Sequence, residues 1–500
     1  MGKAMITKEH SKNLPFVRIM KAELINFKSV HNGTIEFDCS KQFVPYDTKS
    51  DILGIYGQNG SGKTAFIEAL AILKHLMSGS GIPSVYADCI SSNAAFAEMH
   101  FTFDLQYPNG EQRDASYSFK LERIALTQEE IQEAYKDAPP EVTIPKEEFR
   151  LRAFDEVIKL SWTDADGNRK NRQRIFDTQT ERYAFGPNDK RKEILGEDKK
   201  AARDLIIEKE LCSHRSKSFI FSSRTLERID DCGTDTLFYR VLLELRHYAR
   251  HYFHVIDTKS SGFIRLNLML PIYTLFGQFP FSIREANDIP EDVYTEVEKE
   301  INKISAVISQ LVPGLSIFMN VIEKSVDKDG DTINRAVLMA RRDGVDLPIR
   351  DESDGIRKII SELSLIIAAY TQGSVTVAID EFDAGIFEYL LGEILQILEE
   401  SGKGQFIFTS HNLRPLEVID KKFLYFTTTN PDKRYVHLKG IGATNNLRDT
   451  YFREILLGEQ PEEIYKRTKR FKIVAALKKI GEEEKEEERR LAEAAEMEEE

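Results

Sequence analysis

The chain has 500 residues, 41% of them hydrophobic, and a formal net charge of −13. Its length and composition are those of a soluble globular protein with two to four domains and a large core. Four scattered cysteines exclude a disulfide framework. Apolar stretches such as 359–370 are too short to cross a bilayer, and the N-terminus lacks a signal segment, so we expect a cytoplasmic protein without membrane association.

The first motif lies behind a run of predicted strands. Residues 16–37 alternate between apolar and polar side chains, which predicts paired strands, and residues 51–56 form a short apolar strand. The next eight residues are Gly57-Gln58-Asn59-Gly60-Ser61-Gly62-Lys63-Thr64, and helix-forming residues 65–73 follow them. This strand–loop–helix context predicts a phosphate-binding loop, and hence a nucleoside triphosphate.

The residue types of this loop assign its roles. Backbone N–H groups of Asn59, Gly60, Ser61 and Gly62 would face the phosphate oxygens, because glycines allow the required turn and a helix start attracts anions. Lys63 would reach the β- and γ-phosphates, and Thr64 would hold Mg²⁺.

Beyond the loop, residues 97–105 and 115–124 alternate around Asn109-Gly110 and predict a hairpin. Residues 126–312 are richer in charged helical stretches and predict a mostly helical insertion. Its basic block, residues 169–174, fits either an edge strand guarded by charge or a hairpin that contacts nucleic-acid phosphates. The strand pattern resumes at 315–326 and 333–340, which predict another hairpin.

The second half of the nucleotide chemistry is expected near the C-terminus. An apolar strand, residues 374–379, ends in Asp380 and Glu381, and a second one, residues 404–409, ends in Ser410-His411. Strands of this kind suit the middle of a parallel sheet whose end faces the ligand. Asp380 would complete the Mg²⁺ shell, Glu381 would polarise the attacking water, and His411 would sense the γ-phosphate.

A further anion-binding helix start is expected at Ser353 and Gly355, ahead of an amphipathic helix. One γ-phosphate cannot easily use two such helix starts from the same domain. Ser353 and Gly355 are therefore expected to serve ATP bound to a second subunit, although an ordinary N-capped helix is the alternative.

These motifs, in this order, resemble the ATP-binding-cassette heads of the SMC, RecF and OLD-type ATPases. The resemblance covers residues 16–125 and 313–440 and includes Leu24-Ile25-Asn26-Phe27-Lys28-Ser29. It implies that Lys28 and Ser29 lie beside the nucleotide and that Asp383 contacts a second subunit. A glutamine loop is not evident, and Gln106 is the nearest candidate.

The expected fold is thus an α/β ABC-type P-loop NTPase head, with a mixed sheet, flanking helices and an antiparallel β subdomain. The expected parts are an N-terminal lobe (1–125), a mostly helical insertion (126–312), a C-terminal lobe (313–440) and a C-terminal helical region (441–500). Residues 482–500 hold eleven Glu and three basic residues, which predicts a solvated helix or a docking arm.

The chain lacks both the long coiled-coil arms of SMC proteins and a recognisable nuclease domain. In this respect it resembles the ATPase components of bacterial anti-phage defence systems of the Septu, PARIS and abortive-infection types. The resemblance implies a Mg²⁺-dependent ATPase that forms a homodimer or larger oligomer and controls a separate effector, a nuclease or toxin. A RecF-like DNA repair factor that binds nucleic acid, and a scaffold with negligible turnover, remain open.

Overall fold

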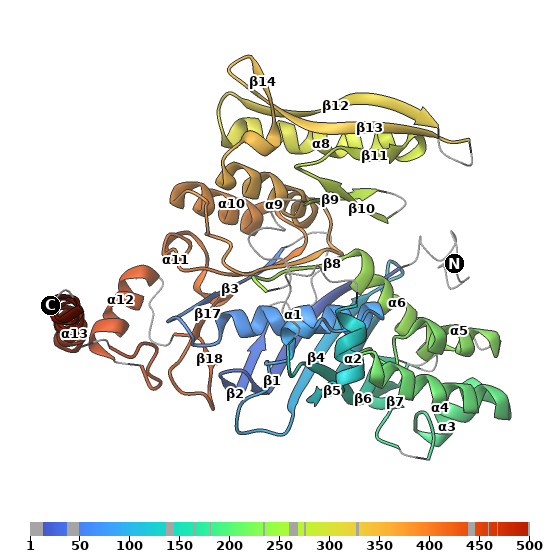
Figure 1. Cartoon of the computed structure of the whole chain (residues 1–500). Coiled ribbons are helices and arrows are strands. Elements are labelled where there is room, and N and C mark those ends of the chain that lie inside the picture. Colours follow the sequence, from blue (N-terminus) through green and yellow to red (C-terminus); the bar gives the residue numbers. More distant parts are fainter. Residues whose placement is uncertain are drawn as a thin grey trace.

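The computed structural model describes residues 14–37, 50–136, 145–163, 167–180, 182–233, 236–259, 269–274, 277–326, 330–438, 446–458, 460–467 and 469–498. The described chain is a mixed α/β protein in which a central, mostly parallel sheet lies between an antiparallel sheet and an upper lobe of helices and strands (Figure 1). This arrangement, with the P-loop between a buried strand and a helix, confirms the predicted fold class.

An antiparallel sheet forms the lower layer in Figure 1. Its strand order is β2-β1-β4-β5-β6-β7. The strands are β1 (Phe16–Phe27), β2 (Val30–Glu36), β4 (Ala97–Gln106), β5 (Gln112–Ala125), β6 (Phe149–Thr163) and β7 (Arg169–Asp177). The predicted pairing within residues 16–37 and the hairpin at Asn109-Gly110 are both confirmed, and Gly110 has the positive φ of 84° that such a turn needs.

The central sheet has the order β18-β17-β3-β16-β15-β8. Its strands are β3 (Asp51–Tyr56), β8 (Phe253–Ile256), β15 (Thr376–Ile379), β16 (Gln405–Thr409), β17 (Leu424–Thr427) and β18 (Tyr435–Val436). Every residue of β3, β15 and β16 is buried, as expected for strands covered on both faces. Parallel pairing brings the ends of β3, β15 and β16 to one edge, where the motifs meet.

Helices cover both faces of the central sheet. Below it lie α1 (Lys63–Ser78) and α6 (Leu237–His251), and above it lie α9 (Asp354–Thr371) and α10 (Glu388–Ser401) (Figure 1). The upper lobe adds α8 (Glu291–Leu311), β9 (Met269–Thr274), β10 (Gly277–Ser282), β11 (Asn287–Pro290), β12 (Leu315–Val326), β13 (Thr332–Arg342) and β14 (Val345–Pro348). The predicted β12–β13 hairpin is confirmed by the pairing of Val326 with Thr332.

Residues 126–312 do not form one separate insertion. Strands β6 and β7 extend the antiparallel sheet, and β8 joins the central sheet beside β15. The helices of this range do occur: α2 (Gln128–Ala134), α3 (Asn188–Leu195), α4 (Lys199–His214), α5 (Ser223–Asp231), α6 and α8. The prediction missed the sheet membership because β6 pairs with β5 across a long loop and β8 is only four residues long. The basic block lies on β7, an exposed edge strand.

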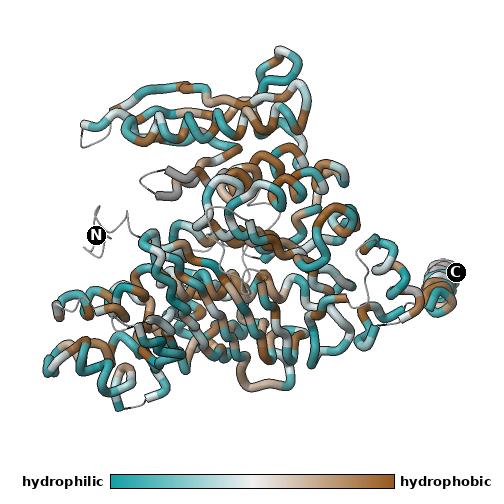
Figure 2. Tube along the Cα trace, turned by 180° about the vertical axis from the view of Figure 1, so that it is seen from behind, coloured by the Kyte–Doolittle hydropathy of each residue, from teal (hydrophilic) through white to brown (hydrophobic). Residues whose placement is uncertain are grey.

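The two faces of the central sheet belong to two hydrophobic clusters. Leu53 and Ile55 of β3 pack with α1 and the antiparallel sheet, whereas Ile52 and Tyr56 pack with α9, α10 and the upper lobe. The apolar sides of these helices appear brown in Figure 2. Three further helices, α11 (Pro415–Val418), α12 (Leu447–Leu457) and α13 (Arg470–Glu498), lead to the C-terminus. Within the described ranges, no helix is long and apolar enough to span a membrane.

Candidate functional site: a phosphate-binding loop and the carboxylates opposite it

The loop before α1 leaves backbone donors open. Gly62 precedes the helix with φ 102°, and no side chain caps the first turn. Gly60 has φ 75°, and a Cβ there would meet open space, whereas a Cβ on Gly57 would lie 1.8 Å from Thr427 Oγ1. An uncapped helix start with glycines at these angles is a ready anion site. The predicted loop residues Asn59, Gly60, Ser61 and Gly62 lie in this loop, and their role as a phosphate cradle stays a prediction.

Lys63 lies inside this loop. Its Nζ donates to the carbonyls of Gly57, at 2.8 Å, and Gln58, at 3.2 Å. Burial lowers the pKa of Lys63, although the carboxylates of Asp380, Glu381 and Asp383 oppose the shift. A partly desolvated ammonium that faces carbonyls and lies near carboxylates is well placed to donate to phosphate oxygens instead.

The short strands β17 and β18 hold the loop from the other side. Ser61 Oγ bonds to the Gln58 carbonyl and to the hydroxyl of Thr427, and Tyr435 donates its hydroxyl to the Gly62 carbonyl at 2.8 Å. Thr427 and Tyr435 were not predicted as loop contacts, because a lone hydroxyl 366 or 373 residues away along the chain has no spacing signal.

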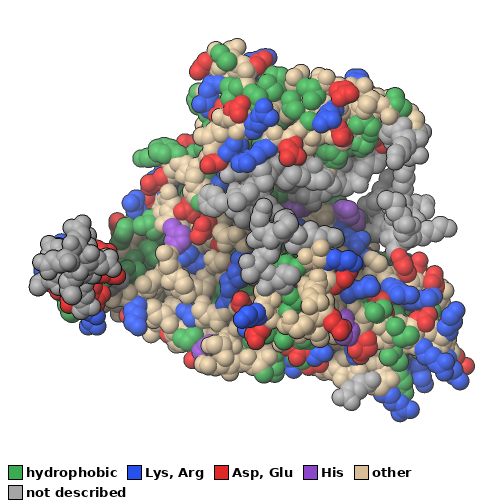
Figure 3. All heavy atoms as spheres, viewed as in Figure 1, with side chains coloured by type: hydrophobic (Ala, Val, Ile, Leu, Met, Phe, Trp, Pro, Cys, Tyr) green, Lys and Arg blue, Asp and Glu red, His purple; other side chains and the backbone are tan. Residues whose placement is uncertain are grey.

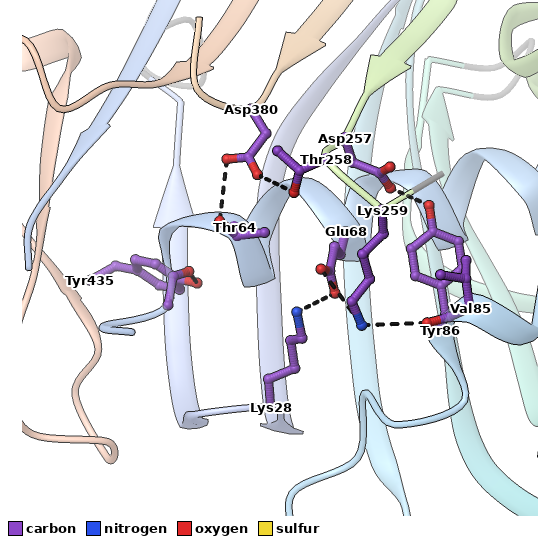
Figure 4. A network of polar contacts seen from close by, with 11 residues as sticks. Lys28, Thr64, Glu68, Val85, Tyr86, Asp257, Thr258, Lys259, Asp380 and Tyr435 are labelled. Carbon is purple, nitrogen blue, oxygen red and sulfur yellow. Dashed lines mark hydrogen bonds and ion pairs between the residues drawn. The ribbon is translucent and has the colours of Figure 1, made fainter. Parts of the chain in front are cut away.

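Asp380 follows β15 and receives three hydroxyl groups, two of which, from Thr64 and Thr258, are drawn in Figure 4. The shortest of these hydrogen bonds comes from Thr409, at 2.6 Å, and longer ones come from Thr258, at 3.2 Å, and Thr64, at 3.4 Å. Its side chain is buried, with the residue 4% exposed. The predicted pair Thr64 and Asp380 is thus brought together across the edge of the sheet.

These residues fit Mg²⁺. A hydroxyl and a carboxylate converge, and no cluster of three or more His, Cys, Asp or Glu that could hold a metal occurs in the described part of the chain. Mg²⁺ is commonly held in this way, by one or two protein oxygens together with substrate phosphates and water. Thr64 and Asp380 would hold the ion, and a bound ion would supply positive charge that offsets the charge of the phosphates.

Glu381 is held in a strained backbone conformation. Its φ is 50°, a value that residues other than Gly rarely adopt. Two contacts maintain it: the Glu381 N–H donates to Thr409 Oγ1 at 2.8 Å, and the Glu381 carbonyl accepts from Lys358 Nζ at 3.0 Å. Strain that neighbours maintain in this way is common at functional sites, and here it fixes Glu381 beside Asp380.

Lys358 joins α9 to the residues after β15. Besides Glu381, its Nζ donates to the Ala384 carbonyl at 2.6 Å and lies 3.5 Å from Glu362 Oε1. Both side chains are buried, and burial raises the pKa of Glu362 to about 8, although Lys358 opposes the shift. This pair was not predicted, because Lys358 and Glu362 lie in an amphipathic helix among apolar residues.

Replacing Lys358 by Met tests its positioning role. We expect Lys358→Met to retain ATP affinity within about threefold and to lose about 10-fold or more in turnover, because losing a buried charged donor costs roughly 1–3 kcal/mol. The measurement is kcat together with the Kd for ATP. Lys324→Met, at an exposed position on β12, is the matched control. Equal losses in binding and turnover would contradict a role confined to Glu381.

The shifted pKa of Glu362 predicts a pH dependence of stability. Since this pKa lies near 8 in the folded protein and near 4.5 ordinarily, the folded state keeps the proton as pH rises between these values. Stability from this group is therefore full below pH 4.5 and is lost as pH rises through 8, by at most about 1.4 kcal/mol per pH unit. Glu362→Gln should flatten the Tm-against-pH curve over this window, whereas Glu323→Gln, exposed on β12, should not. If the Tm-against-pH curves of wild type and Glu362→Gln run parallel, Glu362 does not cause the pH dependence of stability.

His411 and Asp383 meet through the backbone. Asp383 Oδ2 accepts from the N–H of His411, at 3.1 Å, and from that of Asn412, at 2.9 Å. The His411 residue is exposed and follows β16 by two positions, at the same sheet edge as Asp380. Asp383 therefore fixes the turn that carries His411.

Ser353 and Gly355 form a second group at the start of α9. Ser353 is exposed and is the N-cap, since its Oγ accepts from the Ile356 N–H at 3.3 Å. A Cβ on Gly355 would lie 3.1 Å from the Gly385 carbonyl. The contacts of these residues are thus with α9 and the loop after Asp383, and the structure does not join them to the P-loop of the same chain.

Lys28 lies under the other side of α1. It has a positive φ of 51°, and its Nζ is 2.5 Å from Glu68 Oε2, one helical turn after Thr64 (Figure 4). Glu68 is fully buried, and burial raises its pKa while Lys28 opposes the shift. Lys259 adds a second ammonium 4.0 Å from the same carboxylate. Ser29 contributes its carbonyl to Arg434.

The candidate glutamine loop is placed elsewhere. Gln106 ends β4, and its amide donates to Asp104 at 3.3 Å within the antiparallel sheet. The hydroxyl that reaches Asp380 from outside the predicted motifs belongs to Thr258, two residues after β8. A short strand followed by Asp257-Thr258 has no distinctive pattern, so the sequence analysis missed it.

The chain matches one family model and is similar to several solved structures. The family model described as "AAA domain, putative AbiEii toxin, Type IV TA system" matches residues 52–417. No curated protein matches the chain. Among solved structures, an SMC head bound to the C-winged helix domain of ScpA is similar, with 15% identity, 84% of this chain and 98% of that chain covered, and a TM-score of 0.42.

Two more structures show the range of similarity. The SMC head domain from Thermotoga maritima has 13% identity and a TM-score of 0.34, over 85% of this chain and all of that chain. The recombination mediator protein RecF with ATP has 11% identity and a TM-score of 0.32, over 79% of this chain and 94% of that chain. The family model itself spans most of the chain, from β3 through the P-loop and both carboxylates to α11. The chain therefore belongs to the AAA-domain family described as a putative AbiEii toxin of a type IV toxin–antitoxin system.

Proposed function

We propose that this protein binds and hydrolyses ATP with Mg²⁺, that two copies close around the nucleotide, and that closure controls a separate effector, a nuclease or toxin, in bacterial anti-phage defence. The observation that carries the proposal is the convergence of Lys63, Thr64, Asp380 and Glu381 at one edge of the central sheet. Phosphoryl transfer to water needs positioning and charge stabilisation more than covalent chemistry, and these residue types supply both.

Each residue has a defined task in this proposal. Backbone N–H groups of the loop 59–62 bind phosphate oxygens, the Ser61 N–H by leaving the Gln58 carbonyl that it contacts at 3.2 Å, and Lys63 leaves its loop carbonyls to balance the charge that develops on the phosphates. Glu381, fixed by Thr409 and Lys358, orients a water for in-line attack and accepts its proton. The attacking water and the leaving oxygen must lie on opposite sides of the γ-phosphorus, because the two oxygens are roughly in line in the transition state of phosphoryl transfer.

Closure by a second copy is supported by the start of α9. Ser353 is exposed, its Oγ accepts from the Ile356 N–H of its own helix, and it caps a helix whose N-terminus attracts anions. Next to this helix start, beyond Gly385, Phe387 and Tyr389 are 71% and 60% exposed. An exposed aromatic pair of this size beside an anion-binding helix end is typical of an interaction surface. Ser353 and Gly355 would then complete the pocket of the other copy.

Lys358 links the two sites. It stands one turn after Gly355 on α9 and holds the Glu381 carbonyl. If the nucleotide of a second copy contacts the start of α9, a shift of that helix would move Lys358 and with it the Glu381 of the chain to which α9 belongs. Through this connection, each Glu381 would depend on the nucleotide of its own chain and on that of the other copy. The closed dimer would then form fully only when both nucleotides are bound, as a switch for an effector requires.

The effector role is supported by the family description, which names a toxin–antitoxin system. The test is phage challenge of bacteria that carry this chain together with its neighbouring genes. We expect protection with wild type and with Glu323→Gln, an exposed change on β12, and its loss with Lys63→Ala. Protection that survives Lys63→Ala would overturn control by ATP.

DNA repair is the second candidate, because residues 169–174 of β7 are exposed and include four basic side chains. Two of these, Arg169 and Arg174, are already paired with Asp114 and Asp177. On the face shown in Figure 3, basic and acidic side chains are interspersed. A DNA-binding role requires affinity that falls steeply with salt and is lost in Arg172→Glu; salt-independent or absent binding excludes it.

A further inference from the structure

The segment that leads to the C-terminal helix α13 is attached to the P-loop through the side chain of Gln58. Gln58 Oε1 accepts from the Lys466 N–H at 3.0 Å, and Gln58 Nε2 donates to the Lys466 carbonyl at 3.4 Å. Gln58 is the second residue of the P-loop, and Lys466 lies just before α13. The two residues are 408 positions apart along the chain, and no local sequence signal predicts their contact.

The backbone of Gln58 is engaged by the same groups that phosphate oxygens would use. Its carbonyl accepts from Lys63 Nζ at 3.2 Å, from the Ser61 N–H at 3.2 Å and from Ser61 Oγ. If the P-loop binds phosphate as proposed, Lys63 and the Ser61 N–H leave this carbonyl. A carbonyl that loses its donors must find others or turn toward water, because an unpaired carbonyl costs free energy. We therefore expect the Gln58 peptide to reorient when a nucleotide occupies the loop.

The residues before Lys466 have anchors of their own. The Glu463 carbonyl accepts from the Thr429 N–H, which follows β17, at 2.7 Å. Ile464 is 2% exposed and belongs to the apolar cluster of α9, α10 and the upper lobe. These contacts do not involve Gln58. A movement of Gln58 would thus detach Lys466 while the residues before it stay in place.

We propose that Gln58 senses phosphate in the P-loop and releases Lys466 when a nucleotide binds. The contact between Gln58 and Lys466, here called the latch, rests on the proposed nucleotide site and adds a route by which its occupancy reaches the C-terminal region. Directly after Lys466, Arg467 Nε donates to the Ile455 carbonyl of α12 at 3.2 Å. In Figure 1, α12 and α13 stand beyond β17 and β18 at the edge of the molecule. Occupancy of the P-loop therefore changes how this outer part of the chain is held.

Coupling of this kind acts in both directions. If phosphate opens the latch, the latch opposes the binding of phosphate by the same free energy. A chain without the latch should thus bind nucleotide at least as tightly as wild type. A Gln58 side chain that instead supported the bound nucleotide would act in the opposite sense, since its loss would weaken binding. The sign of the change in affinity therefore distinguishes the two roles.

The Lys466 N–H itself reports the state of the latch, because its hydrogen bond to Gln58 protects it from exchange with solvent deuterium. The experiment measures this exchange by mass spectrometry of the full-length protein with Mg²⁺, with and without the β,γ-imido analogue of ATP. We expect exchange at Lys466 to become about 3–10-fold faster with the analogue, the range for losing one hydrogen bond of ordinary net strength. The Thr429 N–H, bonded to the Glu463 carbonyl, is the internal reference and should not change.

Two changes at Gln58 complete the test. Gln58→Leu keeps the size of the side chain but removes both bonds. Exchange at Lys466 should then be fast with and without the analogue, and the Kd for the analogue should equal or fall below that of wild type. Gln58→Glu keeps the accepting oxygen, so exchange without the analogue should stay slow. Gln372→Leu, at an exposed position after α9, is the matched control and should behave as wild type.

Each failure has its own signature. Unchanged exchange at Lys466, in protein that calorimetry shows to bind the analogue, would overturn the latch and leave the nucleotide site intact. Equal acceleration at Thr429 would also overturn it, since the whole segment would then loosen without a specific role for Gln58. A raised Kd in Gln58→Leu would make this side chain a support of the nucleotide. If wild type does not bind the analogue at all, the nucleotide site is refuted and the latch with it.

Discussion

Glu381→Gln is expected to lower ATP turnover at least about 100-fold, because a correctly placed general base contributes roughly 10²–10⁴-fold. ATP binding should stay within a few-fold of wild type, since phosphate and metal are held by Lys63, Thr64 and Asp380 rather than by Glu381. Gln keeps the size of the side chain but cannot accept the proton. With ATP and Mg²⁺, the variant should therefore accumulate as a nucleotide-filled closed dimer.

The measurements are steady-state turnover and the mass of the protein with and without ATP. Glu323→Gln, an exposed carboxylate on β12, is the matched control and should behave as wild type. If Glu381→Gln keeps full turnover, Glu381 is not the base. If wild type shows no turnover at all and Glu381→Gln changes nothing, the chain is a scaffold that binds ATP without using it.

Lys63→Ala should weaken ATP binding by about 30-fold or more, since losing one partner of a partly buried, hydrogen-bonded charge pair costs roughly 2–5 kcal/mol. The fold should tolerate the change. Burial lowers the pKa of Lys63, so the ammonium carries a desolvation cost in the protein without nucleotide, and removing it relieves that cost.

Two readings separate these effects: the Kd for ATP by calorimetry and the Tm without nucleotide. We expect a much larger Kd and a Tm at or above that of wild type. A large fall in Tm would mean that the bonds from Lys63 to Gly57 and Gln58 hold the loop together, and the binding loss would then be structural. Unchanged affinity would contradict the assignment of the loop.

The parts of the fold that could be predicted are those with local signals. The P-loop has fixed spacing, the hairpin at Asn109-Gly110 has its turn residues, and the strand before Asp380 is uniformly apolar. The structure confirms each of these elements. It also brings Thr64 to Asp380, as expected, because parallel strands β15 and β3 carry their ends to one edge. The roles of these residues in catalysis remain predictions.

Other parts depended on contacts that sequence does not encode locally. Thr258 reaches Asp380 from the end of β8, and that strand is recognisable only by its pairing with β15. Tyr435 fixes the P-loop from a two-residue strand. Lys358 looks like a solvent-facing residue of an amphipathic helix but is buried against the Glu381 carbonyl. The range 126–312 was wrongly separated from the core because β6 joins its sheet only through long-range pairing.

The central claim is that each pocket is completed by the Ser353 and Gly355 of another copy. Its most direct test is turnover by co-expressed Lys63→Ala and Ser353→Arg chains, each inactive alone. Mixed dimers contain one pocket with intact Lys63 and intact Ser353, so the mixture should recover up to about a quarter of wild-type turnover if chains pair at random. Turnover no higher than the sum of the two separate variants would contradict a pocket shared between copies.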